Sequence, residues 1–241
     1  MDNFSRRCFN GTVTQKRFRE EYEDPMGFDD VPSPVDFHDP RQAEHWVENT
    51  TKKRPWRVEF FGAFVAQIDR HFDQPVAVLE VGSGPGLLAE HILRRCNVRS
   101  YALLDFSMAM HELARERLEG RLDRASFLHR SFQSANWVDG LDEYDAIVTM
   151  EAIHEVRQKK HIPPLLDQIH GLIRDGGCFF FCDHYYAEGN SGKNPDLYLT
   201  REEQVPALES AGFQQIELLL DKGEMALYRA RKTPRSPKES V

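Results

Sequence analysis

The residues most suggestive of chemistry are the glycines of one short loop. Residues 80–86 read EVGSGPG, follow an apolar run at residues 76–81 and precede a helical pattern. Glycine lets the backbone turn sharply and lets a ligand approach without meeting a Cβ atom. The first turn of the following helix offers free N–H groups to a polar or negative group. The loop therefore predicts a site for a nucleotide-like ligand.

Three kinds of nucleotide site use such a loop. A phosphate-binding P-loop ends in Gly-Lys-Ser/Thr, whereas this loop ends in Gly86-Leu87-Leu88. A dinucleotide fingerprint has the spacing G-x-G-x-x-G, but the third glycine position, counted from Gly82, is occupied by Leu87. The remaining pattern is E-x-G-x-G-x-G, with Glu80 two residues ahead of the first glycine. An acidic residue at a strand end suits an amino group.

This pattern resembles motif I of the class I, Rossmann-like S-adenosylmethionine methyltransferases, and the resemblance extends over roughly residues 56–231. Asp105, 23 residues after Gly82, ends the second apolar run and is expected to be exposed and to accept bonds from ribose hydroxyls. By the resemblance, Phe106 packs on the adenine. Many relatives have Asp-Ala where this chain has Ser131-Phe132, which leaves the adenine amino contact to a serine hydroxyl and a backbone N–H. The residues expected to bind S-adenosyl-L-methionine are Glu80, Gly82, Ser83, Gly84, Gly86, Asp105, Phe106, Ser131, Phe132, Met150 and Glu151.

One histidine is placed to take part in a reaction. His154 follows the fourth apolar run, and an imidazole titrating near neutrality could take a proton from a hydroxyl or amine. The alternative is a buried, hydrogen-bonded histidine at a helix start. Glu151 and Glu155 flank it, so either carboxylate could orient the ring, or neither.

A second polar cluster follows the fifth apolar run, and by the resemblance it could line an acceptor pocket. Tyrosine faces there would favour a sulfonium or amine cation. The alternative is that these side chains only cap and cover a loop. Residues 187–198 could form a mobile flap. By the resemblance, Trp46 and the arm before it could cap the acceptor site; the alternatives are that they pack or form an oligomer contact. The residues expected at the substrate are Trp46, Asp183, His184, Tyr185 and Tyr186.

Composition narrows the class of protein. The net charge of −8 disfavours polynucleotide substrates. The basic groups at Arg94-Arg95 and at Arg157 with Lys159-Lys160 are interpreted as solvated helix ends. The four cysteines form no CxxC pair and no metal-ligand pattern with histidines, so we expect no metal site and a reducing compartment. Without a signal peptide or an apolar run of about 20 residues, we expect a soluble, cytoplasmic protein.

Strand-like and helix-like periods alternate along most of the chain. They predict an α/β fold: a Rossmann-like, mostly parallel seven-stranded sheet with helices on both faces and a C-terminal antiparallel hairpin. We expect an N-terminal helical cap at residues 1–54, the Rossmann-like domain at 55–232 and a disordered tail at 233–241. The predicted helices cover residues 41–50, 55–72, 87–95, 107–121, 163–173 and 200–211, and the predicted strands residues 76–81, 98–104, 125–129, 144–150, 178–182, 213–220 and 224–230.

The resemblance predicts transfer of a methyl group to an O or N atom of a small molecule, without nucleic-acid or membrane partners. Residues 150–153 lack the Asn/Asp-Pro-Pro-Tyr of many amino-methylating nucleic-acid enzymes. Glu151 and Glu155, four residues apart, do not match the glutamate hairpin of protein arginine methyltransferases. Protein or nucleic-acid methylation, and a non-catalytic S-adenosylmethionine-binding protein of the same fold, remain as alternatives.

Overall fold

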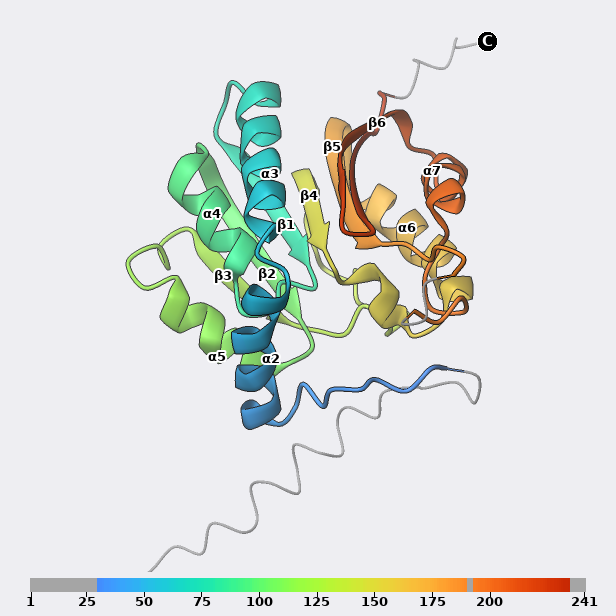
Figure 1. Cartoon of the computed structure of the whole chain (residues 1–241). Coiled ribbons are helices and arrows are strands. Elements are labelled where there is room, and N and C mark those ends of the chain that lie inside the picture. Colours follow the sequence, from blue (N-terminus) through green and yellow to red (C-terminus); the bar gives the residue numbers. More distant parts are fainter. Residues whose placement is uncertain (1–29, 190–192, 235–241) are drawn as a thin grey trace, which may run out of the picture.

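The computed structural model describes residues 30–189 and 193–234 of the chain. Its centre is a seven-stranded sheet in the order β3-β2-β1-β4-β5-β7-β6, with β7 antiparallel to both of its neighbours and the other pairs parallel (Figure 1). The predicted fold class is confirmed. Most of the N-terminal arm with Cys8, part of the predicted flap and most of the predicted tail lie outside the described residues.

The strands form where apolar runs can be covered on both faces. All six residues of β1 are buried, as expected for a central strand of a parallel sheet with helices on each side. The bounds predicted for β1, β3 and β4 are those observed. The strands are β1 (Val76–Val81), β2 (Val98–Asp105), β3 (Ala125–His129), β4 (Tyr144–Met150), β5 (Ile173–His184), β6 (Gln214–Lys222) and β7 (Met225–Arg231).

The helices cover the sheet in two layers. Phe60, Phe64 and Ile68 of α3 join one core with residues of α4 and α5. Leu166 of α6 and Leu208 of α7 belong to a second core on the other face. The helices are α2 (Pro40–Lys53), α3 (Arg57–His71), α4 (Leu87–Arg95), α5 (Met108–Arg117), α6 (Ile162–Gly171) and α7 (Arg201–Ser210), with short 3₁₀ turns η1 (Ile153–Val156) and η2 (Lys159–His161).

Several predicted boundaries differ from the observed ones, and two of these differences involve glycines. The pair Gly176-Gly177 does not end a helix: α6 stops at Gly171 and the pair lies inside β5. A Cβ on Gly177 would lie 2.7 Å from the Asp145 carbonyl oxygen, beside an irregularity in the β4–β5 register. The hairpin turn was predicted at residues 221–223, but Lys222 still pairs with Met225. The turn residues are Gly223 and Glu224, both at positive φ as a two-residue hairpin turn requires.

The edge where the parallel strands end is crossed by N-terminal chain. Figure 1 shows residues 30–39 and α2, in blue, running along the edge where β1 and β4 end. Within the described residues, no helix is both long enough and apolar enough to cross a membrane.

Candidate active site

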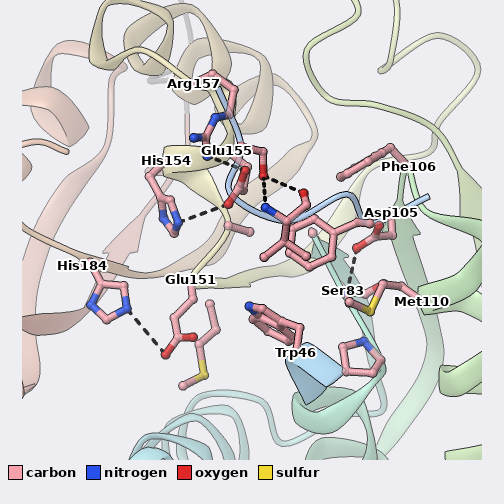
Figure 2. A pocket seen from close by; sticks show the side chains of 18 of the residues that line it. Trp46, Ser83, Asp105, Phe106, Met110, Glu151, His154, Glu155, Arg157 and His184 are labelled. Carbon is pink, nitrogen blue, oxygen red and sulfur yellow. Dashed lines mark hydrogen bonds and ion pairs between the residues drawn. The ribbon is translucent and has the colours of Figure 1, made fainter. Parts of the chain in front are cut away.

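A pocket of about 430 Å³ opens at this edge of the sheet. Its walls come from the loop after β1, from the segments after β2, β4 and β5, and from N-terminal residues, as Figure 2 shows. The structure therefore brings together segments that are far apart in the sequence. Of the residues predicted for the cofactor, the reaction and the substrate, the lining contains Trp46, Glu80, Gly82, Ser83, Gly84, Asp105, Phe106, Phe132, Met150, Glu151, His154 and His184.

The glycine loop owes its shape to residues in the left-handed region. Gly82 and Gly84 have φ values of 71° and 51°. A Cβ on Gly82 would lie 2.3 Å from the Cβ of Ala152, so the loop lies directly against the segment after β4. A Cβ on Gly84 would meet nothing within 4 Å, which leaves room for a ligand against the backbone. Gly86 precedes α4, packs on Ala114 of α5 and lies outside the pocket lining.

Asp105 is buried, contrary to the expectation of an exposed strand tip. Its Oδ2 accepts a hydrogen bond from Gly84 N at 2.7 Å, and its Oδ1 accepts one from Ser107 N at 2.9 Å. Burial raises the pKa of Asp105 to about 6 although these two N–H groups favour the charged form. The carboxylate thus holds the glycine loop against the start of α5, where Ser107 caps the helix as predicted. It still lines the pocket.

Glu80 lies below the loop with only 2% of its surface exposed. The Tyr101 hydroxyl donates to its Oε2 at 2.9 Å. Burial raises the pKa of Glu80 to about 8, against the effect of that hydrogen bond. The carboxyl group is therefore largely protonated at neutral pH.

Ser131 and Phe132 border a second pocket next to the first. Phe132 contributes to both, and Phe106 faces the same space. The Ser131 hydroxyl accepts a hydrogen bond from Gln133 N at 3.3 Å. Ser131, Phe132 and Phe106 thus line one space.

His154 is held between two carboxylates. Its Nδ1 lies 2.7 Å from Oδ1 of Asp183, and its Nε2 lies 3.4 Å from Oε1 of Glu155. Burial alone would lower the pKa of His154, but the two negative charges outweigh it and raise the pKa well above the ordinary 6.5. Asp183 stands behind the ring, outside the lining, and Glu151 does not orient the ring at all.

Glu151 instead belongs to a charged cluster at the pocket wall. Its carboxylate lies 3.0 Å from Arg54 Nη1 and 3.3 Å from Arg57 Nε, and 3.8 Å from His184 Nε2. Both arginines line the pocket and sequence reasoning missed them. The only signal was their spacing, Arg-Pro-Trp-Arg, ahead of an amphipathic helix.

Arg157 was also misinterpreted from the sequence. It is 4% exposed rather than a solvated helix end. Its guanidinium donates to the carbonyl oxygens of Val31 at 2.7 Å and Pro32 at 2.8 Å, and to Glu155 Oε2 at 2.8 Å. Arg157 therefore fastens residues 31–32, which line the pocket, to the carboxylate beside His154.

The two predicted tyrosines lie outside the pocket lining. The Tyr185 hydroxyl donates to Asp221, and Tyr186 forms an isolated bridge with Thr200. Tyr198 lines the pocket in their place, with its ring centroid 4.8 Å from that of His154. The bridge joins Tyr186 to a residue 14 positions later, a contact that the local sequence could not indicate.

The pocket contains polar atoms that make no hydrogen bond. Four buried side-chain atoms of lining residues make no hydrogen bond: Ser83 Oγ, Arg57 Nε, Glu151 Oε1 and His184 Nε2. Buried polar groups are normally satisfied, so these atoms are suited to a polar ligand. Together with the open space at Gly84, they fit a ligand with a polar, charged end.

Comparison with known proteins agrees with this geometry. Residues 78–177 match the family model described as a methyltransferase domain. Residues 78–177 are therefore similar to a methyltransferase domain. No curated protein sequence matches the chain significantly. The matched residues extend from β1 to the glycine pair in β5 and contain the loop, Asp105 and His154.

Solved structures resemble the fold of most of this chain. An O-methyltransferase family protein from Burkholderia thailandensis aligns with a TM-score of 0.66 at 14% identity, over 81% of this chain and 61% of that one. Human N-acetylserotonin methyltransferase, in complex with SAM, aligns with a TM-score of 0.61 at 15% identity, over 82% of this chain and 58% of that one. The protein of the DhpI–SAH complex aligns with a TM-score of 0.62 at 16% identity, over 81% of this chain and 96% of that one. The chain thus spans about three fifths of the length of the first two, and these likenesses concern the fold.

Proposed function

We propose that this protein transfers a methyl group from S-adenosylmethionine to an O or N atom of a small-molecule acceptor. The observation that carries the proposal is one pocket that contains both the open glycine loop and the His154 ring. S-adenosylmethionine would supply an activated methyl group on a sulfonium, so the protein mainly has to position and deprotonate the acceptor.

The cofactor end of the pocket is formed by the loop after β1. Gly84 leaves space beside the backbone, and the Ser83 hydroxyl is buried without a partner. Asp105 keeps lone pairs besides those used by the Gly84 and Ser107 N–H groups, so it can also accept from hydroxyls. We assign the ribose to Asp105 and the adenine to the space between Phe106 and Phe132.

His154 is the proposed general base. Asp183 accepts from Nδ1, which leaves Nε2 of the neutral ring to take a proton from the acceptor. The raised pKa makes the ring a strong base once it is neutral, and Arg157 holds Glu155 beside it. The acceptor oxygen or nitrogen would give its proton to Nε2 of His154, and S-adenosylmethionine would supply the methyl group and leave as a neutral thioether.

The small size of the acceptor is supported by the cover over the pocket. Pro32, Pro34 and Val35 line it from the N-terminal side, and Arg157 fastens this segment in place. Leu197 and Tyr198 close another side. A folded protein or duplex surface could not approach His154 without displacing these residues.

Titration calorimetry with S-adenosylmethionine and with NAD tests the donor. We expect binding of S-adenosylmethionine and none of NAD, and the reverse result would contradict the proposal. Turnover is then measured as methyl transfer from labelled S-adenosylmethionine to a panel of phenols, amines and carboxylic acids. Binding without transfer to any panel member, but with transfer to protein or nucleic acid, would also contradict it.

A further inference from the structure

The charged cluster of Arg54, Arg57, Glu151 and His184 has a chemistry that methyl transfer itself does not require. Three of its atoms are buried and make no hydrogen bond: Arg57 Nε, Glu151 Oε1 and His184 Nε2. Glu151 Oε1 lies 3.3 Å from Arg57 Nε, so these two are held only by an ion pair. Arg57 and His184 are each 7% exposed and Glu151 is 9% exposed. All four residues line the pocket, so the three atoms without a hydrogen bond lie where a ligand could reach them.

The cluster presents both hydrogen-bond donors and acceptors. Arg54 and Arg57 have planar guanidinium groups, which suit a carboxylate. His184 Nδ1 lies 3.3 Å from the carbonyl oxygen of Glu224 and therefore carries the ring hydrogen. Burial lowers the pKa of His184 to about 3, so the ring is neutral and its Nε2 is an acceptor. Glu151 Oε1, 3.8 Å away, is a second acceptor.

Two donors for a carboxylate beside two acceptors for an ammonium complement an α-amino-acid group. With Arg54, Arg57 and Glu151 charged and His184 neutral, the cluster has one excess positive charge. A lone cation would therefore be repelled, and a lone anion would leave both acceptors unsatisfied. A zwitterion that carries both groups on one carbon satisfies the donors and the acceptors together.

The position of the cluster indicates which ligand carries these two charged groups. Glu151 directly precedes Ala152, whose Cβ is the atom that a Cβ on Gly82 would meet at 2.3 Å. The cluster therefore adjoins the glycine loop at the end of β1, and Asp105 lies at the end of β2 on the other side of that loop. Asp105 and the cluster thus lie on opposite sides of the glycine loop, where the two ends of one ligand that crosses the loop would lie.

We propose that Arg54 and Arg57 bind the carboxylate of the methionine end of S-adenosylmethionine, while Glu151 and His184 accept from its ammonium. The arginines are thus specificity residues for the amino-acid end of the cofactor. The assignment rests on the proposed function for the identity of the ligand. It also replaces Glu80, which is buried beneath the loop against Tyr101, as the main partner of the amino group.

The test compares the binding of three nucleosides by calorimetry: S-adenosylmethionine, its decarboxylated analogue and 5′-methylthioadenosine. We expect the wild-type protein to bind S-adenosylmethionine about ten- to a hundredfold more tightly than the decarboxylated analogue, as for a charge-assisted pair. In Arg54→Gln this ratio should fall below about threefold, while the affinity for the decarboxylated analogue stays within about twofold of wild type. Arg54 is the variant of choice because its side chain is 36% exposed.

Two further variants and a control complete the design. Arg57→Gln should lose the same discrimination, with folding checked by thermal melting because this side chain is 8% exposed. Glu151→Gln should weaken the binding of S-adenosylmethionine about tenfold or more and leave the affinity for 5′-methylthioadenosine unchanged. Lys52→Gln removes a positive charge from an exposed site near the end of α2, two residues before Arg54, and should change none of these ratios.

The outcomes separate this inference from the proposed function. If the wild-type protein binds none of the nucleosides, the methyltransferase proposal fails as well. If it binds S-adenosylmethionine but Arg54→Gln and Arg57→Gln keep the wild-type preference for the carboxylate, only the present assignment is overturned. The latter result would also be expected if the cluster held an amino-acid acceptor instead of the cofactor.

Discussion

Asp183 binds both the backbone and the ring of His154. Its Oδ2 accepts from His154 N at 2.9 Å, and its Oδ1 lies 2.7 Å from Nδ1 of the same residue. Burial alone would raise the pKa of Asp183, but the charge of His154 outweighs this and lowers it, so the carboxylate is ionised. Nδ1 must then carry a hydrogen, and the ring orientation is fixed with Nε2 on the pocket side.

Replacement of His154 by alanine should remove the proton acceptor and leave the cofactor end of the pocket intact. We expect kcat to fall by a factor of about 10²–10⁴, the usual contribution of a general base. The dissociation constant for S-adenosylmethionine should stay near the wild-type value. Steady-state kinetics and calorimetry measure the two effects. His45→Ala, at an exposed position, is the control, and full activity in His154→Ala would remove the catalytic role.

The carboxylate of Glu155 should set the pH at which His154 becomes active. Below its pKa the ring is an imidazolium and cannot accept a proton, so activity should rise with pH through a pKa above 6.5. Glu155→Gln removes one of the two negative charges that raise this pKa. The rising limb of the kcat/KM profile should therefore move to lower pH in the variant. A limb that stays in place, or moves upward, would show that another group is being titrated.

Removal of the Asp105 carboxylate should weaken cofactor binding. Asp105→Ala deletes the proposed ribose acceptor, which should cost about 1–3 kcal/mol of binding free energy. The same change frees Gly84 N and Ser107 N, so the melting temperature has to be measured beside the dissociation constant. Asp123→Ala, an exposed acidic residue beyond α5, serves as the control. An unchanged dissociation constant would contradict the ribose assignment.

Glu80 should make the ligand-free protein less stable as the pH rises. Its pKa is about 8 in the folded protein and 4.5 in the ordinary case, so the folded state holds more protons between these values. The free energy of unfolding should then decrease with pH in this window, by at most about 1.4 kcal/mol per pH unit. Glu80→Gln keeps an oxygen for the Tyr101 hydroxyl but does not titrate.

Denaturant unfolding of both proteins at pH 5, 6, 7 and 8 checks this prediction. The difference in stability between Glu80→Gln and wild type should grow in favour of the variant as the pH increases. Taking the difference cancels groups that titrate equally in both proteins. A difference that stays constant with pH, or that shrinks, would mean that Glu80 is ionised in the folded protein throughout.

Much of the fold was predictable because its signals are local. The bounds of β1 and of α4 follow from the change between an apolar run, a glycine loop and a helical period within 20 residues. The capping box at Thr200 and Glu203 also acts within one helical turn and was confirmed. The glycine pair in β5 was misassigned because its role depends on Asp145 of the neighbouring strand.

The sequence by itself determined three features of this protein: the glycine loop after β1, the carboxylate at the end of β2 and the strand–helix alternation that makes a parallel sheet. Those features lie within single strand–loop–helix units, where spacing decides geometry. Only the tertiary structure decided the rest. Asp183 meets His154 because parallel β4 and β5 end side by side, and Arg157 reaches Val31 across 126 residues of chain. Such contacts depend on strand register and helix packing, which no local pattern encodes.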